Sequence, residues 1–264
     1  MTAAAAAALP PPEDPWQPLR THTRARIGLR RAGETLATPE VLSFTASHAV
    51  ARDAVRTPLD LGEMSERLAA LGIGDPVHVP SAAPDRDRYL RRPDLGRVPA
   101  NPGELPCGGG DIALVVADGL SAKAVHEHAA RLCAALVESL SARYRFCPPV
   151  IATQARVALG DHIGRALGAG IVIVVIGERP GLSVVDSLGL YLTYDPRPGR
   201  ADSERNCISN VHPPDGLGYT GAAAIALDLI EQMYRQGRSG VAIKARPVHS
   251  LDSGPTPHLE LHRP

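Results

Sequence analysis

The feature that most constrains the fold is an apolar run in the second half of this 264-residue chain. Residues 171–176 are all Ile or Val, and the polar turn Glu178-Arg179-Pro180-Gly181 follows closely. The run is too short to cross a bilayer, because a spanning helix needs about 20 apolar residues. A strand that is apolar on both faces is typical of a parallel sheet covered by helices on each side. Because ligands bind at the carboxyl ends of such strands, the turn is expected to face a ligand.

Strand and helix patterns alternate around this run. Strands are expected at residues 111–119, 148–154, 170–178, 189–194 and 206–211, with 189–194 at an edge of the sheet. Helices are expected at residues 122–144, 156–168 and 219–235. This alternation predicts βαβ units. The expected fold class is therefore α/β, with a Rossmann-like doubly wound, mostly parallel sheet preceded by a small helical N-terminal domain.

The N-terminal part has a different pattern. Helices are expected at 38–55, 61–71 and 85–91, the first beginning with Thr38 as N-cap and Pro39 in its first turn. The expected organisation is a disordered Ala/Pro-rich start (1–17), a helical N-terminal domain (18–97), a linker (98–110), an α/β domain (111–244) and a flexible tail (245–264).

Composition excludes several classes of function. Lys plus Arg equals Asp plus Glu at 28 each, and aromatic residues make up 3%, which disfavours nucleic-acid binding. The four cysteines are scattered without C-x-x-C spacing, which fits reduced cytoplasmic thiols better than disulfides or a zinc site. No secretory signal is recognised, and a cytoplasmic location is expected.

Local motifs leave several alternatives open. Gly108-Gly109-Gly110 precedes a strand, whereas a phosphate-binding loop follows one, so a linker is favoured. Asp118 and Ser121, at a strand-to-helix turn, fit helix capping better than a bond to a ligand hydroxyl. His162 beside Asp161 could be an oriented base, but a polar helix face is favoured.

Two further groups are candidates for chemistry. Glu178 and Arg179 could bind a ligand, or they could form an ion pair with each other or between Arg179 and Asp186; neither reading is favoured. Cys207 could be a nucleophile, but no histidine lies near it in the sequence, and a residue lining a crevice is favoured.

Several motifs together resemble one family. They are ARIGLRR, FTASHAVARDAV, YLRRPDLGR, VVADGLSAKAV, RVALGDHIG, IGERPGLSVVDSLGLYLTY, RNCISN and SGVAIK. Over about residues 19–244 the sequence resembles the small (light) subunit of ethanolamine ammonia-lyase. The run GLRR at 28–31 departs from the family's usual glycine-containing pattern, which concerns the N-terminal contact with the large subunit.

The resemblance implies a subunit of an adenosylcobalamin-dependent lyase that converts ethanolamine to acetaldehyde and ammonia by a radical mechanism. It implies that the catalytic residues lie on the large subunit and that this chain, inactive alone, covers the cofactor. It assigns cofactor binding to Val157, Glu178 and Cys207, with Arg156, Arg179 and Asn206 as flanking candidates and no histidine ligand to cobalt.

The resemblance also implies an assembly of six large and six small subunits, with association with a bacterial microcompartment in hosts that make one. Two alternatives stay open. The chain could be a stand-alone doubly wound enzyme with a Ser or Cys nucleophile, although it lacks a G-x-S-x-G motif. It could also be an assembly module that does not touch the cofactor.

Overall fold

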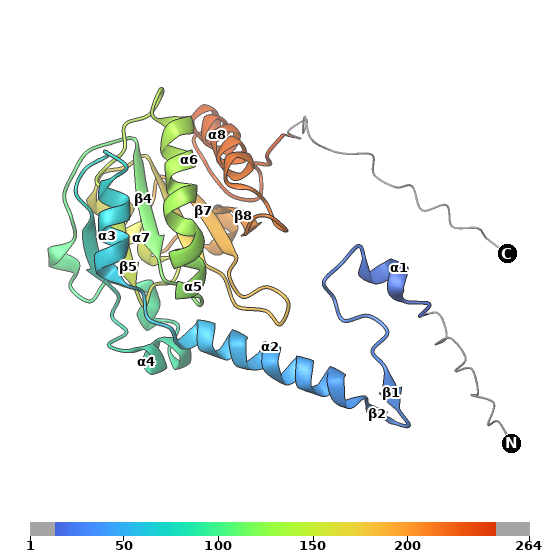
Figure 1. The fold of residues 1–264 in the computed structure, drawn as a ribbon. Helices are drawn as coiled ribbons and strands as arrows, with labels where there is room; N and C mark the ends of the chain where they lie inside the picture. The colour runs from blue at the N-terminus through green and yellow to red at the C-terminus, as the bar shows by residue number, and fades with distance from the viewer. Residues whose placement is uncertain (1–13, 247–264) are drawn as a thin grey trace, which may run out of the picture.

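A six-stranded sheet forms the centre of the protein (Figure 1). The computed structural model describes residues 14–246, and expectations for residues 1–13 and 247–264 lie outside this range. The strands are β3 (Val77–Pro80), β4 (Ile112–Ala117), β5 (Val150–Thr153), β6 (Ile171–Gly177), β7 (Leu188–Tyr194) and β8 (Asn206–Val211). Their order is β3-β5-β4-β6-β7-β8. The first four in this order are parallel, whereas β7 is antiparallel to both β6 and β8.

This arrangement confirms the α/β class and a mostly parallel sheet. The edge position expected for residues 189–194 is wrong, because β7 lies between β6 and β8. Local pattern alone cannot distinguish an internal from an edge position here, because Leu188, Leu190 and Leu192 alternate with less apolar residues, as they would in an edge strand with one buried face. The far side of β8 is held by residues 239–243, since the Asn206 amide group bonds to the backbone of Gly240 and Ile243.

Helices cover both faces of the sheet. α3 (Leu61–Ala69), α6 (Ala130–Leu140) and α8 (Tyr219–Gln236) pack on one face, and α7 (Leu159–Ala166) packs on the other. Strand β4 shows the alternation: Ile112, Leu114 and Val116 enter the first core, and the residues between them enter the second. This two-sided burial explains the continuous apolar runs of β4 and β6.

The long helix expected at 122–144 is divided. It begins as α5 (Ala122–Ala124), continues as a π-helical turn, η3 (Val125–Ala129), and becomes α6, which ends at Leu140. Ser121 is its N-cap, because its hydroxyl oxygen accepts a hydrogen bond from the Ala124 N–H at 3.2 Å. The expected capping role of Ser121 is therefore confirmed.

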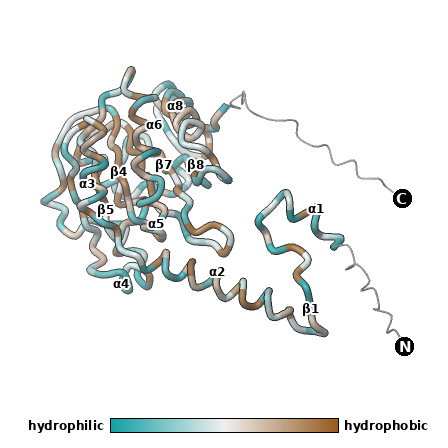
Figure 2. Tube along the Cα trace, viewed as in Figure 1, coloured by the Kyte–Doolittle hydropathy of each residue, from teal (hydrophilic) through white to brown (hydrophobic). Residues whose placement is uncertain are grey.

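The N-terminal segment extends away from the sheet (Figure 1). It contains α1 (Gln17–Arg20), the two-residue strands β1 (Arg31–Ala32) and β2 (Thr35–Leu36), and α2 (Thr38–Arg56). The predicted N-cap is wrong by one residue: Ala37 caps α2, and Thr38 is already helical. Of the residues of α2 only Ala54 is buried, and large apolar side chains are exposed along the helix: Val41, Leu42, Phe44 and Val50. Figure 2 shows apolar residues along the trace of α2.

Residues 58–105 lie against the sheet. α3 and α4 (Arg86–Arg91) confirm two predicted helices, with Asp60 and Asp85 as their N-caps. Strand β3 is not among the predicted elements, since VHVP is short and its proline is typical of an edge strand. Short 3-10 turns also occur within residues 14–246: η1 (Leu95–Arg97), η2 (Pro102–Glu104) and η4 (Asp202–Glu204). The domain boundary at 98–110 stays a prediction.

Candidate functional site

A cavity of about 440 Å³ opens where the chain reverses its direction across the sheet. From β4 the chain crosses to β5 on one side, and from β5 it returns to β6 on the other side of β4. The carboxyl ends of β4 and β6 therefore form the topological switch point, at which α/β proteins bind ligands. The cavity is lined by Tyr89, Gly119, Leu120, Arg156, Val157, Ile176, Gly177, Glu178, Arg179 and Tyr191.

Two glycines form the floor of this cavity. Gly119 has φ +56°, and a Cβ atom on it would lie 2.2 Å from the Gly177 carbonyl oxygen. A Cβ atom on Gly177 would lie 2.1 Å from the Ser121 carbonyl oxygen. The two turns approach so closely that the Leu120 N–H donates to the Gly177 carbonyl at 2.9 Å. Only glycine fits at both positions, and the floor is consequently backbone.

Asp118 holds the loop between β5 and α7. Its buried carboxylate accepts hydrogen bonds from the backbone N–H groups of Gln154 and Ala155, at 2.8 and 3.0 Å. It also lies 3.6 Å from the Arg86 guanidinium. The capping role expected for Asp118 is therefore wrong, because its carboxylate oxygens accept hydrogen bonds from the loop between β5 and α7. That loop leads directly to Val157, so Asp118 positions one wall of the cavity.

Glu178 ends β6 with its carboxylate in the cavity wall. The Ser187 hydroxyl donates to this carboxylate, and the Glu178 N–H donates to the Ser187 carbonyl at 3.0 Å. Gly189 makes room for it, since a Cβ atom there would lie 2.9 Å from Glu178 Oε1. Among residues 14–246 neither Glu178 nor Arg179 forms an ion pair, so neither structural alternative considered for this motif is present.

Val157 and Cys207 both lie near Tyr191. Val157 lines the main cavity and also a neighbouring one of about 300 Å³. Cys207, on β8, is paired with Tyr191 of β7, whose side chain lines both cavities. Cys207 itself lines neither cavity. The structure therefore brings Val157 and Glu178 into one wall, with Cys207 adjacent to it.

The surroundings of Cys207 do not favour a nucleophile. Burial raises the pKa of the Cys207 thiol, which outweighs the opposing effect of the hydrogen bond from the Tyr191 side chain. A raised pKa keeps the group as a neutral thiol near pH 7, whereas a nucleophilic cysteine reacts as the thiolate. The structure therefore favours a residue of the cavity rim.

Alkylation tests this reading. In a Cys107→Ser variant, which removes the other exposed thiol, we expect Cys207 to react slowly with iodoacetamide at pH 7. Because the folded-state pKa is raised, the rate should increase about tenfold per pH unit up to at least pH 9. Unfolded chain in urea is the control, since its thiols titrate near their ordinary pKa. A rate that is already constant above pH 7 would contradict the assignment.

Tyr89 is a site residue that the sequence did not reveal. Its ring is fully buried, its hydroxyl donates to the Ala155 carbonyl at 3.0 Å, and burial raises its pKa to about 12. The guanidinium carbons of Arg86 and Arg156 lie 4.7 and 4.4 Å from the ring centroid. The only signal was an aromatic residue within the predicted helix 85–91, and two of its partners, Ala155 and Arg156, lie more than 60 residues further along the chain.

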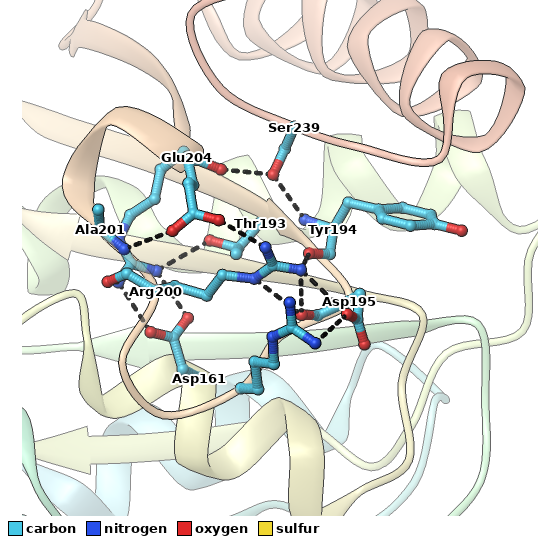
Figure 3. A network of polar contacts seen from close by, with 10 residues as sticks. Asp161, Thr193, Tyr194, Asp195, Arg200, Ala201, Glu204 and Ser239 are labelled. Atoms are coloured by element: carbon cyan, nitrogen blue, oxygen red, sulfur yellow. Dashed lines mark hydrogen bonds and ion pairs between the residues drawn. The ribbon is translucent and has the colours of Figure 1, made fainter.

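A buried ion pair supports the second cavity (Figure 3). Arg205 donates to both carboxylate oxygens of Asp161, at 2.6 and 2.7 Å, and both side chains are 2% exposed. Arg205 also donates to Thr193 Oγ1 at 3.1 Å and to the Arg200 carbonyl at 2.9 Å. Asp161 thus pairs with Arg205, which contradicts its proposed role beside His162. The pair joins α7, which follows Val157, to β8, which carries Cys207.

Metal sites and membrane-spanning helices are two further features that bear on function. No group of three or more His, Cys, Asp or Glu side chains within residues 14–246 is arranged to hold a metal ion. No helix in the same range is long and apolar enough to cross a membrane.

The fold and the cavity define an α/β protein with a cavity at the carboxyl edge of its sheet. Comparison with known sequences gives the family. The sequence profile described as "Ethanolamine ammonia-lyase light chain (EutC)" matches residues 13–244. The chain belongs to this family, which confirms the resemblance inferred from its motifs, and the members are subunits of a lyase.

Individual relatives agree with the profile. An ethanolamine ammonia-lyase small subunit from Rhodococcus erythropolis is 55% identical over 231 residues, which cover 88% of this chain and 90% of the relative. A small subunit from Ralstonia nicotianae is 50% identical over 252 residues, covering 92% and 93%. One from Azotobacter vinelandii is 48% identical over 244 residues, covering 89% and 90%.

Proposed function

We propose that this chain helps to bind and cover adenosylcobalamin at an interface with a catalytic large subunit. Together the two subunits would convert ethanolamine to acetaldehyde and ammonia by a radical mechanism. The observation that carries the proposal is the cavity at the β4–β6 switch point in a chain of this family, lined by Val157 and Glu178 and bordered by Cys207. These three residues are the proposed cofactor-binding residues.

The residues present fit such a cofactor. The cavity wall combines an apolar side chain (Val157), a carboxylate (Glu178) and a floor of glycine backbone, which suits a large ring with amide side chains. Arg156 lines the cavity, and its guanidinium has no hydrogen-bond partner among residues 14–246, so the wall has an unused donor group. The cavity is open and far smaller than a corrinoid, which supports a second wall from the partner.

Binding and orientation are the proposed tasks of this chain. The cofactor, when bound, supplies the radical through homolysis of its cobalt–carbon bond, and the protein controls its position. We propose no catalytic residue and no cobalt ligand in this chain. The neutral thiol of Cys207 also argues against the alternative of a stand-alone enzyme with a cysteine nucleophile.

The N-terminal region, residues 18–97, is the proposed contact with the large subunit. Its helix α2 extends from the sheet and exposes large apolar side chains, with Leu42 at 64% and Val50 at 47% exposure. Such a surface is typical of a protein interface. An assembly of six large and six small subunits, in the cytoplasm or in a microcompartment where the host makes one, completes the proposal.

We also propose that the sheet has the Rossmann-like, doubly wound form. The order β5-β4-β6, with helices on both faces, supports a Rossmann-like doubly wound sheet. The antiparallel strand β7 departs from the all-parallel form.

A double variant tests the site. In complex with the large subunit, Glu178→Ala/Cys207→Ala is expected to weaken adenosylcobalamin binding by about tenfold or more, because it removes a carboxylate acceptor and a rim contact. Affinity is measured by titration of the cobalamin absorbance. The matched control is Glu138→Ala/Cys107→Ala, which removes an exposed glutamate and an exposed cysteine that line no cavity. Unchanged affinity in the site variant would instead support a pure assembly module.

A further inference from the structure

Arg156 lines the main cavity, and among residues 14–246 its guanidinium group is held only by stacking on an aromatic ring. Its guanidinium lies on the buried Tyr89 ring, and its Nε is fully buried without a hydrogen-bond partner. No ion pair and no side-chain hydrogen bond joins it to another residue in that range. Its Nη1 and Nη2 atoms also have no hydrogen-bond partner in that range, and they are not fully buried, so they can meet an acceptor in the cavity that the buried Nε cannot reach.

The charges around the cavity point to an anion. Three neighbouring arginines are matched by carboxylates, and these pairs are Arg86–Asp118 at 3.6 Å, Arg97–Asp202 at 3.8 Å and Arg205–Asp161 at 2.6 Å. The Glu178 carboxylate accepts from Ser187. Arg156 and Arg179 have no such carboxylate among the described residues, and both line the cavity. The lining therefore holds two arginines without a carboxylate partner and one carboxylate, Glu178, whose partner Ser187 is neutral, so positive charge is in excess by one.

The head of Arg156 is also pre-organised. Its backbone N–H donates to the Gly96 carbonyl at 2.8 Å, and its stem packs on Gly96, where a Cβ atom would lie 2.9 Å from Arg156 Cγ. The Tyr89 ring then fixes the plane of the guanidinium. A planar fork held in this way matches the oxygens of a phosphate group, and little entropy is lost when it binds.

We infer that Arg156 binds the phosphodiester group of the ligand in this cavity, with Arg179 adding charge at the rim. The inference rests on the proposed function, because cobalamin carries one phosphodiester, in the chain that joins its nucleotide to the ring. It gives Arg156 a role separate from Val157, Glu178 and Cys207, which are proposed to contact other parts of the cofactor.

The test compares ligands that differ in the phosphate. The complex with the large subunit is titrated with cobalamin, with cobinamide phosphate, and with cobinamide, which lacks phosphate and nucleotide; binding is followed by absorbance. We expect Arg156→Gln to weaken the two phosphate-bearing ligands by about 10- to 100-fold and to leave cobinamide within about twofold. Arg156→Lys keeps the charge without the fork and should show a smaller loss, again confined to the phosphate-bearing ligands.

The control is Arg235→Gln on α8, an exposed arginine that lines neither cavity, and it should bind all three ligands as the unaltered complex does. An equal loss for all three ligands in Arg156→Gln, or no loss, would overturn the inference and leave Arg156 with a packing role on Tyr89. Failure of the unaltered complex to bind cobalamin would instead overturn the proposed function. If Arg156→Gln does not fold, Arg156→Lys provides the test, with the loss again expected only for the phosphate-bearing ligands.

Discussion

Replacing Asp161 by alanine is expected to lower the free energy of unfolding by about 3–5 kcal/mol. The change removes the bidentate partner of Arg205, which keeps two neutral acceptors, Thr193 Oγ1 and the Arg200 carbonyl, and the exposed carboxylate of Asp202 at 3.4 Å from its Nε. A buried guanidinium whose remaining carboxylate is exposed to solvent is poorly compensated, which costs far more than a lost surface pair. The measurement is urea unfolding of the full chain, followed by circular dichroism.

Two variants make this result specific. Asp195→Ala removes an exposed carboxylate that pairs with Arg200 at 3.0 Å, and it should cost less than about 1 kcal/mol. Asp161→Leu/Arg205→Met removes both buried charges, and we expect it to be more stable than Asp161→Ala. A loss for Asp161→Ala as small as that for Asp195→Ala would show that the pair does not support the fold.

The central elements of the fold were predictable because their patterns are local. β4 and β6 are apolar on both faces, and α3 and α4 begin at Asp caps that the sequence displays. β3 was not predicted, because its four residues, which end in proline, are too few to show the alternation of apolar and polar residues that is typical of a strand. The internal position of β7 depends on its pairing with both β6 and β8, and strand order is a property of the whole sheet.

The site was predictable to a smaller extent. Glu178 could be placed at a ligand edge, because it directly follows a buried strand. Val157 was indicated by resemblance alone, whereas Cys207 was also expected from its sequence surroundings to line a crevice. The partners of Asp161 and Asp118 could not be predicted, since Arg205 and the Gln154 backbone are 44 and 36 residues away in sequence. The close contact of Gly119 with Gly177 likewise appears only when β4 and β6 lie side by side.

The second large effect concerns activity. This chain is expected to have no ethanolamine deaminase activity alone, and the large subunit without it is expected to lose most of its turnover. The physical reason is that, in the proposed function, the cavity forms one wall only, and its residues would bind and orient a cofactor whose chemistry needs a closed site. With both subunits and adenosylcobalamin, turnover in the ordinary enzyme range of about 1–10³ s⁻¹ is expected.

The most direct measurement is therefore a reconstitution assay. Acetaldehyde release from ethanolamine is followed for this chain alone, for the large subunit alone and for the mixture, each with and without adenosylcobalamin. The account predicts turnover only in the mixture with the cofactor, at a rate that saturates when the two subunits are equimolar. Turnover by this chain alone, or equal turnover by the large subunit with and without this chain, would contradict it.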